Sequence, residues 1–395
     1  MKTSRTVYLD HSATTPLSSE ALEAMLPYFS ERYGNASAIY RLGREAKQGL
    51  EDARRRVAEV LNAKPSEIVF TASGSESDNL VLRGVAWAAR RAGRGNHLIV
   101  SGVEHKAVLE TAKQLRDLFD FELTILPVDS YGRVDPDDLR KAIRSDTVLV
   151  SIMAANNEVG TLQPIAALAA VAHEYGVPFH TDAVQAAGHL PLDVQAWGVD
   201  ALSLSAHKFY GPKGVGVAYV RDGVPLVSAI TGGGHEHKRR AGTENVAGIV
   251  GLATALHQAE QLRPAESERL LSLRNRLLEE IPARIPGTRI SGHPHERLPH
   301  HASFLFEGIE IQGVLMGLDM AGIAASSGSA CTSAAQAPSS VLTAMGVDAV
   351  AAAGHLRLTM GRATREEDID YLLEVLPPLV MRLRTLTSAD SLQTS

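Results

Sequence analysis

The stretch that decides the fold is DALSLSAHKFYGPKGVG, residues 200–216, in which a short apolar run stops before a lysine. Residues 201–205 predict a strand, and the glycines and proline of 211–216 predict a turn, so Lys208 lies at a strand end. In an α/β sheet, ligands bind at the carboxyl ends of the strands. A lysine there, with Ser205 and His207 as hydrogen-bonding neighbours, is typical of a Schiff-base nucleophile held near a phosphate. The alternative is a solvated surface lysine, so the assignment depends on the rest of the chain.

The same pattern, a strand followed by polar side chains, recurs along the chain. The expected strands and the polar residues that follow them are 67–71 with Gly74 and Ser75, 97–101 with His105, 147–154 with Asn157, and 177–181 with Asp182 and Gln185. Helices expected at 108–119 and 165–175 alternate with these strands, which predicts a largely parallel sheet with right-handed crossovers. Each polar residue taken singly could be a helix cap or a satisfied core group. Together, at one edge of one sheet, they indicate a ligand.

The types of these side chains indicate pyridoxal phosphate (PLP). Asp182 can pair with a protonated pyridine nitrogen and so keep the ring an electron sink. The other expected contacts are His105 stacked on the ring, Asn157 and Gln185 near its phenolic oxygen, Gly74, Ser75, Ser205 and His207 around the phosphate, and Lys208 on the aldehyde. Small residues between a strand and a helix offer backbone N–H groups to an anion, although a plain helix cap is the alternative. A Rossmann dinucleotide site is disfavoured because no G-x-G-x-x-G with a following acidic residue occurs after a strand.

Composition limits the class of protein. The chain has 395 residues, 45% of them hydrophobic and 21% charged, which favours two globular domains. A net charge of -6 gives no electrostatic reason to expect a nucleic acid or an anionic membrane as partner. No apolar run approaches the roughly 18 residues of a membrane span, and we find no signal peptide, so a cytoplasmic protein is expected. The single cysteine, Cys331, excludes an intramolecular disulfide and a multi-cysteine metal site within one chain, and no metal is expected.

The second half of the chain predicts a smaller domain. Helical patterns at 245–261 and 266–281 are separated by Pro264, which we interpret as the domain boundary. Strands at 302–306 and 355–360 and helices at 311–320 and 340–345 then predict an α+β unit. The expected domains are therefore a large PLP-binding domain at 17–262 and a small domain formed by 1–16 and 263–395.

The loop at 324–340 consists almost entirely of small residues, and we expect it to be mobile. A buried structural cysteine normally has large apolar neighbours, whereas Cys331 lies in the middle of this loop, which favours an exposed, reactive thiol. Arg357, on the strand that follows, could clamp a substrate carboxylate with two hydrogen bonds. A structural ion pair is the alternative for Arg357.

Taken together, these features resemble the cysteine desulfurases, PLP enzymes of the class V aminotransferase family, over nearly the whole chain. The matching segments are 8–16, 70–79, 104–107, 156–158, 180–185, 205–208, 240–243 and 326–333. The string SSGSACTS at 326–333 is similar to the long-loop subgroup that supplies sulfur for iron–sulfur cluster assembly. The sequence departs from the family's commoner pattern at 71–75, where hydroxyl residues are kept, and in a short tail after Leu386.

The resemblance implies the PLP-dependent transferase fold of type I, as in aspartate aminotransferase, with a mainly parallel sheet in the large domain. It implies conversion of L-cysteine to L-alanine, with the sulfur held as a persulfide on Cys331 for iron–sulfur assembly or tRNA thiolation. The implied further roles are Cα-proton transfer by Lys208, proton relay to the thiol by His105, binding of the substrate carboxylate by Asn35, Asn157 and Arg357, and contact of Thr243 with the phosphate of the other subunit. The implied partners are a second copy of the chain and a sulfur-acceptor protein such as an iron–sulfur scaffold.

Alternatives remain open at this point. A selenocysteine lyase and a thiol-independent class V aminotransferase would share most of the cofactor residues. A cofactor-binding or scaffold-binding protein that has lost catalysis belongs to a different class, which the complete set of expected residues disfavours.

Overall fold

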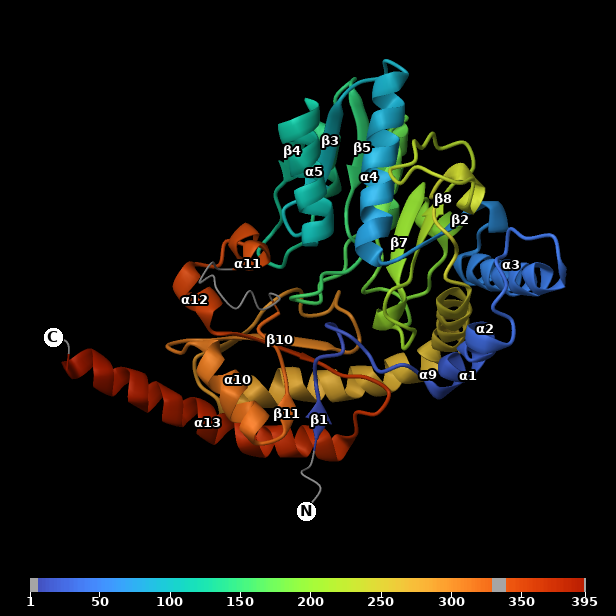
Figure 1. Cartoon of the computed structure of the whole chain (residues 1–395). Coiled ribbons are helices and arrows are strands. Elements are labelled where there is room, and N and C mark those ends of the chain that lie inside the picture. The colour runs from blue at the N-terminus through green and yellow to red at the C-terminus, as the bar shows by residue number, and fades with distance from the viewer. Residues whose placement is uncertain (1–5, 329–338, 394–395) are drawn as a thin grey trace.

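The computed structural model describes residues 6–328 and 339–393, and its central element is a seven-stranded sheet (Figure 1). The strand order is β2-β8-β7-β6-β5-β3-β4. The strands are β2 (Ile68–Thr71), β3 (His97–Ser101), β4 (Glu122–Leu126), β5 (Thr147–Ser151), β6 (Phe179–Asp182), β7 (Ala201–Ser205) and β8 (Gly216–Val220). Among these described strands, β8 pairs antiparallel with β2 and β7, and the other pairs are parallel. The expected largely parallel sheet is confirmed.

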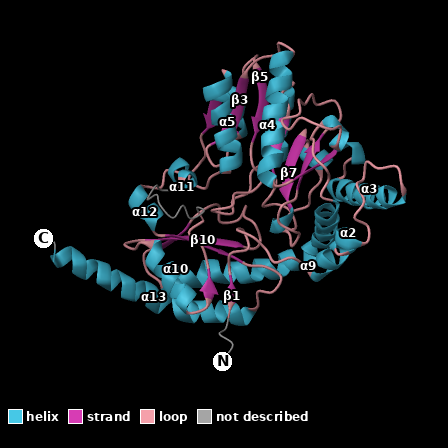
Figure 2. Cartoon of the chain, in the orientation of Figure 1, coloured by secondary structure: helices cyan, strands magenta, loops and turns pink. Residues whose placement is uncertain are grey.

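Helices cover both faces of this sheet, which explains why most of its strands are buried along their whole length (Figure 2). In β3, Leu98 and Val100 join the cluster under α4 (Gly74–Arg91) and α5 (Lys106–Phe119), while Ile99 joins the cluster on the opposite face. The opposite face is covered by α3 (Arg41–Leu61), α6 (Pro136–Ala142), α7 (Ile165–Glu174) and the first part of α9 (Val246–Arg284). The short helices α1 (Ser19–Met25), α2 (Pro27–Ser30) and α8 (Val194–Trp197) complete this part.

A second, smaller sheet has the order β12-β10-β9 and is antiparallel. Its strands are β9 (Thr288–Ile290), β10 (His301–Phe306) and β12 (His355–Thr359), and a separate parallel pair joins β1 (Val7–Tyr8) to β11 (Ile323–Ala324). The helices around it are α10 (Ile311–Met320), α11 (Ser340–Ala344), α12 (Ala349–Ala353) and α13 (Glu366–Gln393). The N-terminal segment thus lies with the C-terminal part of the chain (Figure 1).

The helix α9 differs from the expectation of two helices separated at Pro264. It runs for 39 residues without a break, and Pro264 lies exposed inside it. Ala259 belongs to the core under the large sheet, and Leu270 belongs to the core of the small sheet. Burial at both ends outweighs the roughly 3 kcal/mol that a proline costs inside a helix. Within residues 6–328 and 339–393, no helix is both long enough and apolar enough to cross a membrane.

Candidate active site

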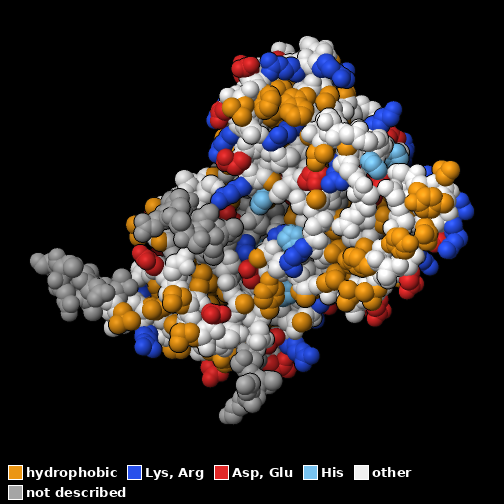
Figure 3. Space-filling view, viewed as in Figure 1, with side chains coloured by type: hydrophobic (Ala, Val, Ile, Leu, Met, Phe, Trp, Pro, Cys, Tyr) orange, Lys and Arg blue, Asp and Glu red, His pale blue; other side chains and the backbone are white. Residues whose placement is uncertain are grey.

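The carboxyl ends of β2, β3, β5, β6 and β7 meet at one edge of the large sheet, facing the small sheet. Figure 3 shows a hollow between the two parts of the molecule in which His, Lys and Arg side chains gather. The strand-end residues expected from the sequence therefore come from separate strands of one sheet, as a ligand site requires.

Lys208 lies in the short 3-10 turn Ala206–Lys208 that follows β7. Its ammonium donates hydrogen bonds to the carbonyl oxygens of Ser12 (2.6 Å) and Ala13 (2.8 Å). Burial and then the positive charge of Arg357 lower the pKa of Lys208 to about 8. A substantial fraction of this amine is therefore neutral, and hence nucleophilic, near physiological pH.

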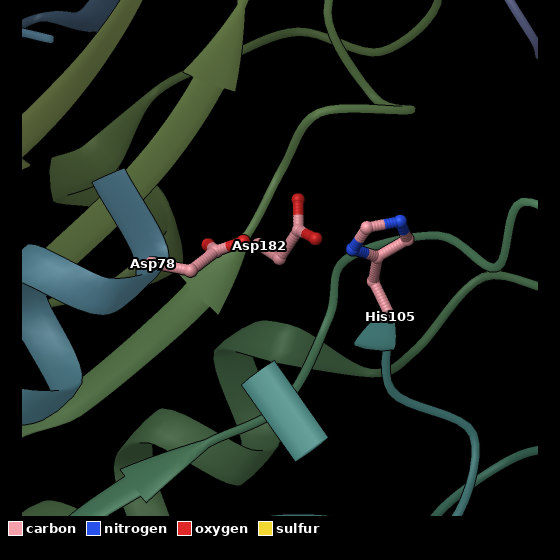
Figure 4. Close-up of side chains that lie close together, drawn as sticks. All are labelled: Asp78, His105 and Asp182. Carbon is pink, nitrogen blue, oxygen red and sulfur yellow. The ribbon is translucent and has the colours of Figure 1, made fainter. Parts of the chain in front are cut away.

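Asp182 and His105 face each other across the site (Figure 4). Asp182, the last residue of β6, is buried and accepts a hydrogen bond from the Val184 N–H (2.9 Å). His105 caps α5, where its Nδ1 accepts a hydrogen bond from the Ala107 N–H (3.1 Å). Burial raises the pKa of the Asp182 carboxyl, and His105 opposes that effect. The pair thus combines a buried carboxylate with an imidazole fixed by its own helix.

Gln185 is tied to the same backbone as Lys208. Its Nε2 donates a hydrogen bond to the Ser12 carbonyl oxygen (3.0 Å), which also accepts from the lysine. The segment after β1 therefore crosses the site and fixes two of the expected cofactor residues relative to each other.

A close junction between α4 and β7 forms the expected phosphate end. Ser73 caps α4, and a Cβ added at Gly74 would lie 2.8 Å from Val184 Cγ2 and 3.2 Å from Ser205 Cβ. A side chain at position 74 would therefore force Val184, Ser205 or the start of α4 to shift, so glycine permits this close approach. Ser75 is exposed in the first turn of α4, where a helix N-terminus favours an anion.

His207 lies beside this junction, with its Nδ1 3.1 Å from Thr14 Oγ1. Burial and the charge of Lys208 lower the pKa of His207 to about 4. The ring is therefore neutral at physiological pH and can contribute a hydrogen bond but no charge.

Arg357, on β12, reaches the site from the small sheet. Its Nη2 pairs with Asp10 Oδ1 (2.6 Å), and its Nη1 donates to the carbonyl oxygens of Asn157 (2.8 Å) and Gly328 (3.2 Å). The structural ion pair weighed as the alternative is therefore present. The buried Nε has no hydrogen-bond partner among the described residues. Binding of a substrate carboxylate by Arg357 or Asn157 stays a prediction.

Within the described residues, neither Asn35 nor Thr243 forms a hydrogen bond or an ion pair with Lys208. Asn35 lies exposed between α2 and α3, where its Oδ1 accepts from the Ser37 N–H (2.8 Å). Thr243 is exposed in the loop before α9. Cys331 lies outside the described residues. Their assigned roles stay predictions.

The flanks of the cysteine loop are described and lie together. Ser339 Oγ donates to Glu158 Oε2 (2.5 Å), and a Cβ added at Gly328 would lie 3.3 Å from Glu158 Cβ. Because Gly328 also accepts from Arg357, the chain enters and leaves the undescribed segment next to the expected carboxylate site.

Sequence reasoning did not identify Asp78, whose carboxyl lies within 4.8 Å of the ligand atoms of Asp182 and His105 (Figure 4). Its signal is helical spacing: Asp78 follows Gly74 by one turn, so the two residues lie on the same face of α4. The partner of Arg357, Asp10, carried no comparable local signal.

These residues fit PLP. A lysine of lowered pKa, a buried carboxylate and a glycine-dependent helix start supply the contacts needed for its aldehyde, ring nitrogen and phosphate. Asp78, His105 and Asp182 could also ligate a cation, but two of them are the residues expected at the cofactor ring. We therefore assign the group to the cofactor.

Comparisons with known proteins agree with this chemistry. The family model described as aminotransferase class-V matches residues 7–372. Among curated proteins, the cysteine desulfurase IscS of Dictyoglomus turgidum is 48% identical over 383 residues, which are 97% of this chain and 96% of that protein. The cysteine desulfurase IscS of Methanosarcina thermophila is 49% identical over 383 residues, covering 97% of this chain and 94% of that protein.

Solved structures give the same result. A NifS-like protein superposes with a TM-score of 0.90 at 38% identity, covering 96% of this chain and all (100%) of the other. A structure described as SspA in complex with cysteine has a TM-score of 0.79 at 36% identity and covers 90% of this chain and 99% of the other. The chain therefore belongs to the class V aminotransferase family and, within it, to the PLP-dependent cysteine desulfurases.

Proposed function

We propose that this chain converts L-cysteine to L-alanine with PLP and keeps the sulfur as a persulfide on Cys331. The observation that supports it best is the convergence of Lys208, Asp182 and Gln185 on one sheet edge, with the pKa of Lys208 lowered to about 8. When bound, PLP supplies an electron sink for the charge that develops on the substrate Cα.

The residues of the large sheet would bind and orient the cofactor. Asp182 would pair with the ring nitrogen, His105 would lie against the ring, and Gln185 and Asn157 would reach the phenolic oxygen. The N-terminus of α4 with Gly74 and Ser75, and the side chains of Ser205 and His207, would hold the phosphate. Lys208 would bind the aldehyde and, once released by the substrate amine, would take the Cα proton.

The substrate carboxylate would bind at Arg357, with Asn157 and Asn35 as further contacts. The Nε of Arg357 supports this, because it is a buried charged donor without a hydrogen-bond partner among the residues that the structure describes. The solved relative described as being in complex with cysteine supports L-cysteine as the substrate class.

Cys331 would accept the sulfur. Its thiolate attacks the substrate Sγ, the Cβ–Sγ bond breaks with its electron pair left on carbon, and protonation of that carbon completes the alanyl group. His105 would take the thiol proton, since it is exposed at the site edge. The described flanks Gly328 and Ser339 place both ends of the loop beside Glu158.

We also propose a homodimer and a separate sulfur acceptor such as an iron–sulfur scaffold protein. Figure 3 shows hydrophobic side chains gathered over the α1–α3 region, where Phe29, Tyr33, Ile39 and Tyr40 are all exposed, Ile39 by 90%. A second copy covering this region would bring Thr243 toward the partner's phosphate site, as the family resemblance implies. A free thiol at Cys331 fits the reducing cytoplasm.

The test is one turnover with L-cysteine. We expect alanine release together with one added sulfur at Cys331, detected by mass spectrometry, and both should be lost in Cys331→Ser while that variant still binds PLP. Because Cys331 is the single cysteine, the added sulfur has one possible thiol carrier. Alanine formation by Cys331→Ser at the native rate would contradict the role of the thiol.

The same assay separates the alternatives. A selenocysteine lyase would release alanine from L-selenocysteine but not from L-cysteine. An aminotransferase would convert the cofactor to its amino form in proportion to turnover and would need a keto acid to continue. A protein that has lost catalysis would bind PLP and release no alanine from either amino acid.

A further inference from the structure

A carboxyl group without an assigned role lies directly behind Asp182. Asp78, in the second turn of α4, is 1% exposed, and its Oδ1 has no hydrogen-bond partner among the described residues. This carboxyl lies within 4.8 Å of both Asp182 and His105 (Figure 4). A buried polar atom without a partner is costly, so its protonation state needs an explanation.

Within the described part of the chain, the groups that face Asp78 provide no buried cation. His180, on β6, lies with its Nε2 3.8 Å from Asp78 Oδ1. Its Nδ1 is 2.8 Å from Ser151 Oγ and its Nε2 is 3.0 Å from Ser203 Oγ. Both ring nitrogens therefore have hydroxyl partners, and burial lowers the pKa of His180 to about 3. The ring is neutral at physiological pH.

The remaining charged neighbours are mostly carboxyl groups. Glu104, from the turn before α5, is buried and accepts from Ser101 Oγ (2.6 Å) and from the Met153 N–H (2.9 Å). Burial raises the pKa of Glu104 to about 8. His105, at the start of α5, is exposed and faces Asp182 from the opposite side. Lys208 favours the charge of Asp182.

Two ionised carboxylates cannot share this buried position without a cation between them. Burial, and next the charge of Asp182, raise the pKa of Asp78 well above its ordinary value, and the Ser203 hydroxyl offsets only part of this effect. Asp182 differs from Asp78 in having a backbone donor, the Val184 N–H, and in facing His105 and Lys208. The charge is therefore favoured on Asp182 and the proton on Asp78.

We propose that Asp78 is a positioning residue that stays protonated behind Asp182, so that the buried pair carries one negative charge, located on Asp182 and directed at the pyridine nitrogen. The proposal rests on the assignment of this edge as the PLP site. When Asp78 is neutral, no second buried anion repels the charge of Asp182. Asp182 then remains ionised over the pH range in which the ring nitrogen must stay protonated.

Infrared spectroscopy of the holoenzyme tests the proposal directly. A protonated carboxyl has a carbonyl stretch that an ionised carboxylate lacks. We expect the difference spectrum of the native holoenzyme and Asp78→Asn at pH 7 to show the loss of one such carbonyl band. The matched control is Glu104→Gln, which should remove a different band. Loss of a carboxylate band alone in Asp78→Asn would overturn the proposal.

A second measurement uses the full chain without cofactor and does not depend on desulfuration. A carboxyl whose folded pKa is raised destabilises the fold above its unfolded pKa of about 4, because folding then requires a proton that the unfolded chain has released. Replacing that carboxyl should therefore remove this pH-dependent loss of folding stability. We expect the unfolding midpoint of Asp78→Asn to rise relative to the native chain by a few degrees between pH 4.5 and pH 7.5.

If the unfolding midpoints of Asp78→Asn and the native chain differ by the same amount across this pH range, Asp78 has a purely structural role and the proposal is overturned. If Asp78→Asn does not fold, the native chain labelled with 13C-aspartate gives the same infrared readout, and absence of a protonated aspartate band at pH 7 overturns it. Failure of the enzyme to release alanine would contradict the proposed function but would leave both readouts of Asp78 unchanged.

Discussion

At the scale of the residue, Lys208 shows how a fold sets the chemistry of one amine. Burial disfavours its charged form, and Arg357 adds like-charge repulsion, so the pKa of Lys208 falls to about 8. Asp182 and Asp10 act in the opposite direction. The carbonyl groups of Ser12 and Ala13 meanwhile fix the position of the amine. The site thus keeps the lysine oriented and makes a larger fraction of it neutral near pH 7 than an exposed lysine would have.

The capture of PLP by the cofactor-free chain should follow this pKa. Because the neutral amine attacks the aldehyde, the capture rate should rise about tenfold per pH unit below pH 8 and level off above it. Stopped-flow absorbance of the bound cofactor measures the rate. Arg357→Met removes a cation that lowers the lysine pKa, so the midpoint should move to higher pH. A native midpoint near 10.5, the ordinary lysine value, would contradict the assignment.

At the scale of the element, local pattern predicted most of the sheet edge. The strand expected at 201–205 is β7 and the helix expected at 311–320 is α10, with the same bounds. Strands buried on both faces read as short apolar runs bounded by turn residues, so their ends, and the polar residues there, follow from the sequence. The expected separation of two helices at Pro264 was wrong, because burial of α9 in two cores is not visible locally, whereas the domain boundary placed there stays a prediction.

Contacts between distant segments could not be predicted in the same way. Arg357 and Asp10 are 347 positions apart. The local sequence around the arginine was equally consistent with a substrate-carboxylate contact and with a structural ion pair. Lys208 meets the Ser12 carbonyl across 196 positions, and a carbonyl carries no signal in the sequence. Register within an element follows from its periodicity, whereas pairing across domains depends on the assembled fold.

The junction of α4 with β7 should depend on glycine. Gly74→Ala places a Cβ 2.8 Å from Val184 Cγ2, so the start of α4 must move away from Ser205 and out of the expected phosphate site. We expect PLP affinity to fall by at least about tenfold, since a misplaced anion site loses charge-assisted hydrogen bonds. Fluorescence titration of the cofactor-free chain measures this.

The control for Gly74→Ala is Gly313→Ala in α10. Its added Cβ would meet Leu383 side-chain atoms at 3.4 Å, an ordinary contact, and α10 belongs to the small-sheet part of the molecule. This variant should keep native PLP affinity. Equal losses in both variants would show that the effect of Gly74→Ala is global destabilisation and not a local displacement.

At the scale of the whole molecule, the site depends on how the two sheets are joined. His189, beyond β6, stacks on His300, before β10, with ring centroids 3.6 Å apart and an interplanar angle of 12°. His300 Nε2 lies 3.4 Å from Ser12 Oγ, in the segment that holds Lys208. His301 and His355 are also fully buried nearby on the small sheet. The contact that aligns the two halves is therefore built largely from neutral imidazoles.

This contact should make the molecule sensitive to acid. Burial lowers the pKa of His189 to about 3 and that of His355 to about 4, and it lowers the pKa of His300 and His301 well below the ordinary value of 6.5. Below pH 6.5 these histidines bind protons in the unfolded chain but stay neutral in the folded chain. The free energy of unfolding therefore falls as pH falls. The loss is about 1.4 kcal/mol per pH unit for each group until its folded pKa is reached.

We therefore expect the unfolding midpoint of the cofactor-free chain to drop steeply between pH 6.5 and pH 5 in scanning calorimetry. His189→Gln removes one titrating group and should make this slope shallower, whatever its effect on stability at pH 8. Thr254→Ser, at a half-buried position on α9 outside the cluster, changes no titrating group and should keep the native slope. An unchanged slope in His189→Gln would mean that His189 is protonated in the folded chain. In that case the stacking of His189 on His300, which lies beside Ser12, would not require a neutral His189.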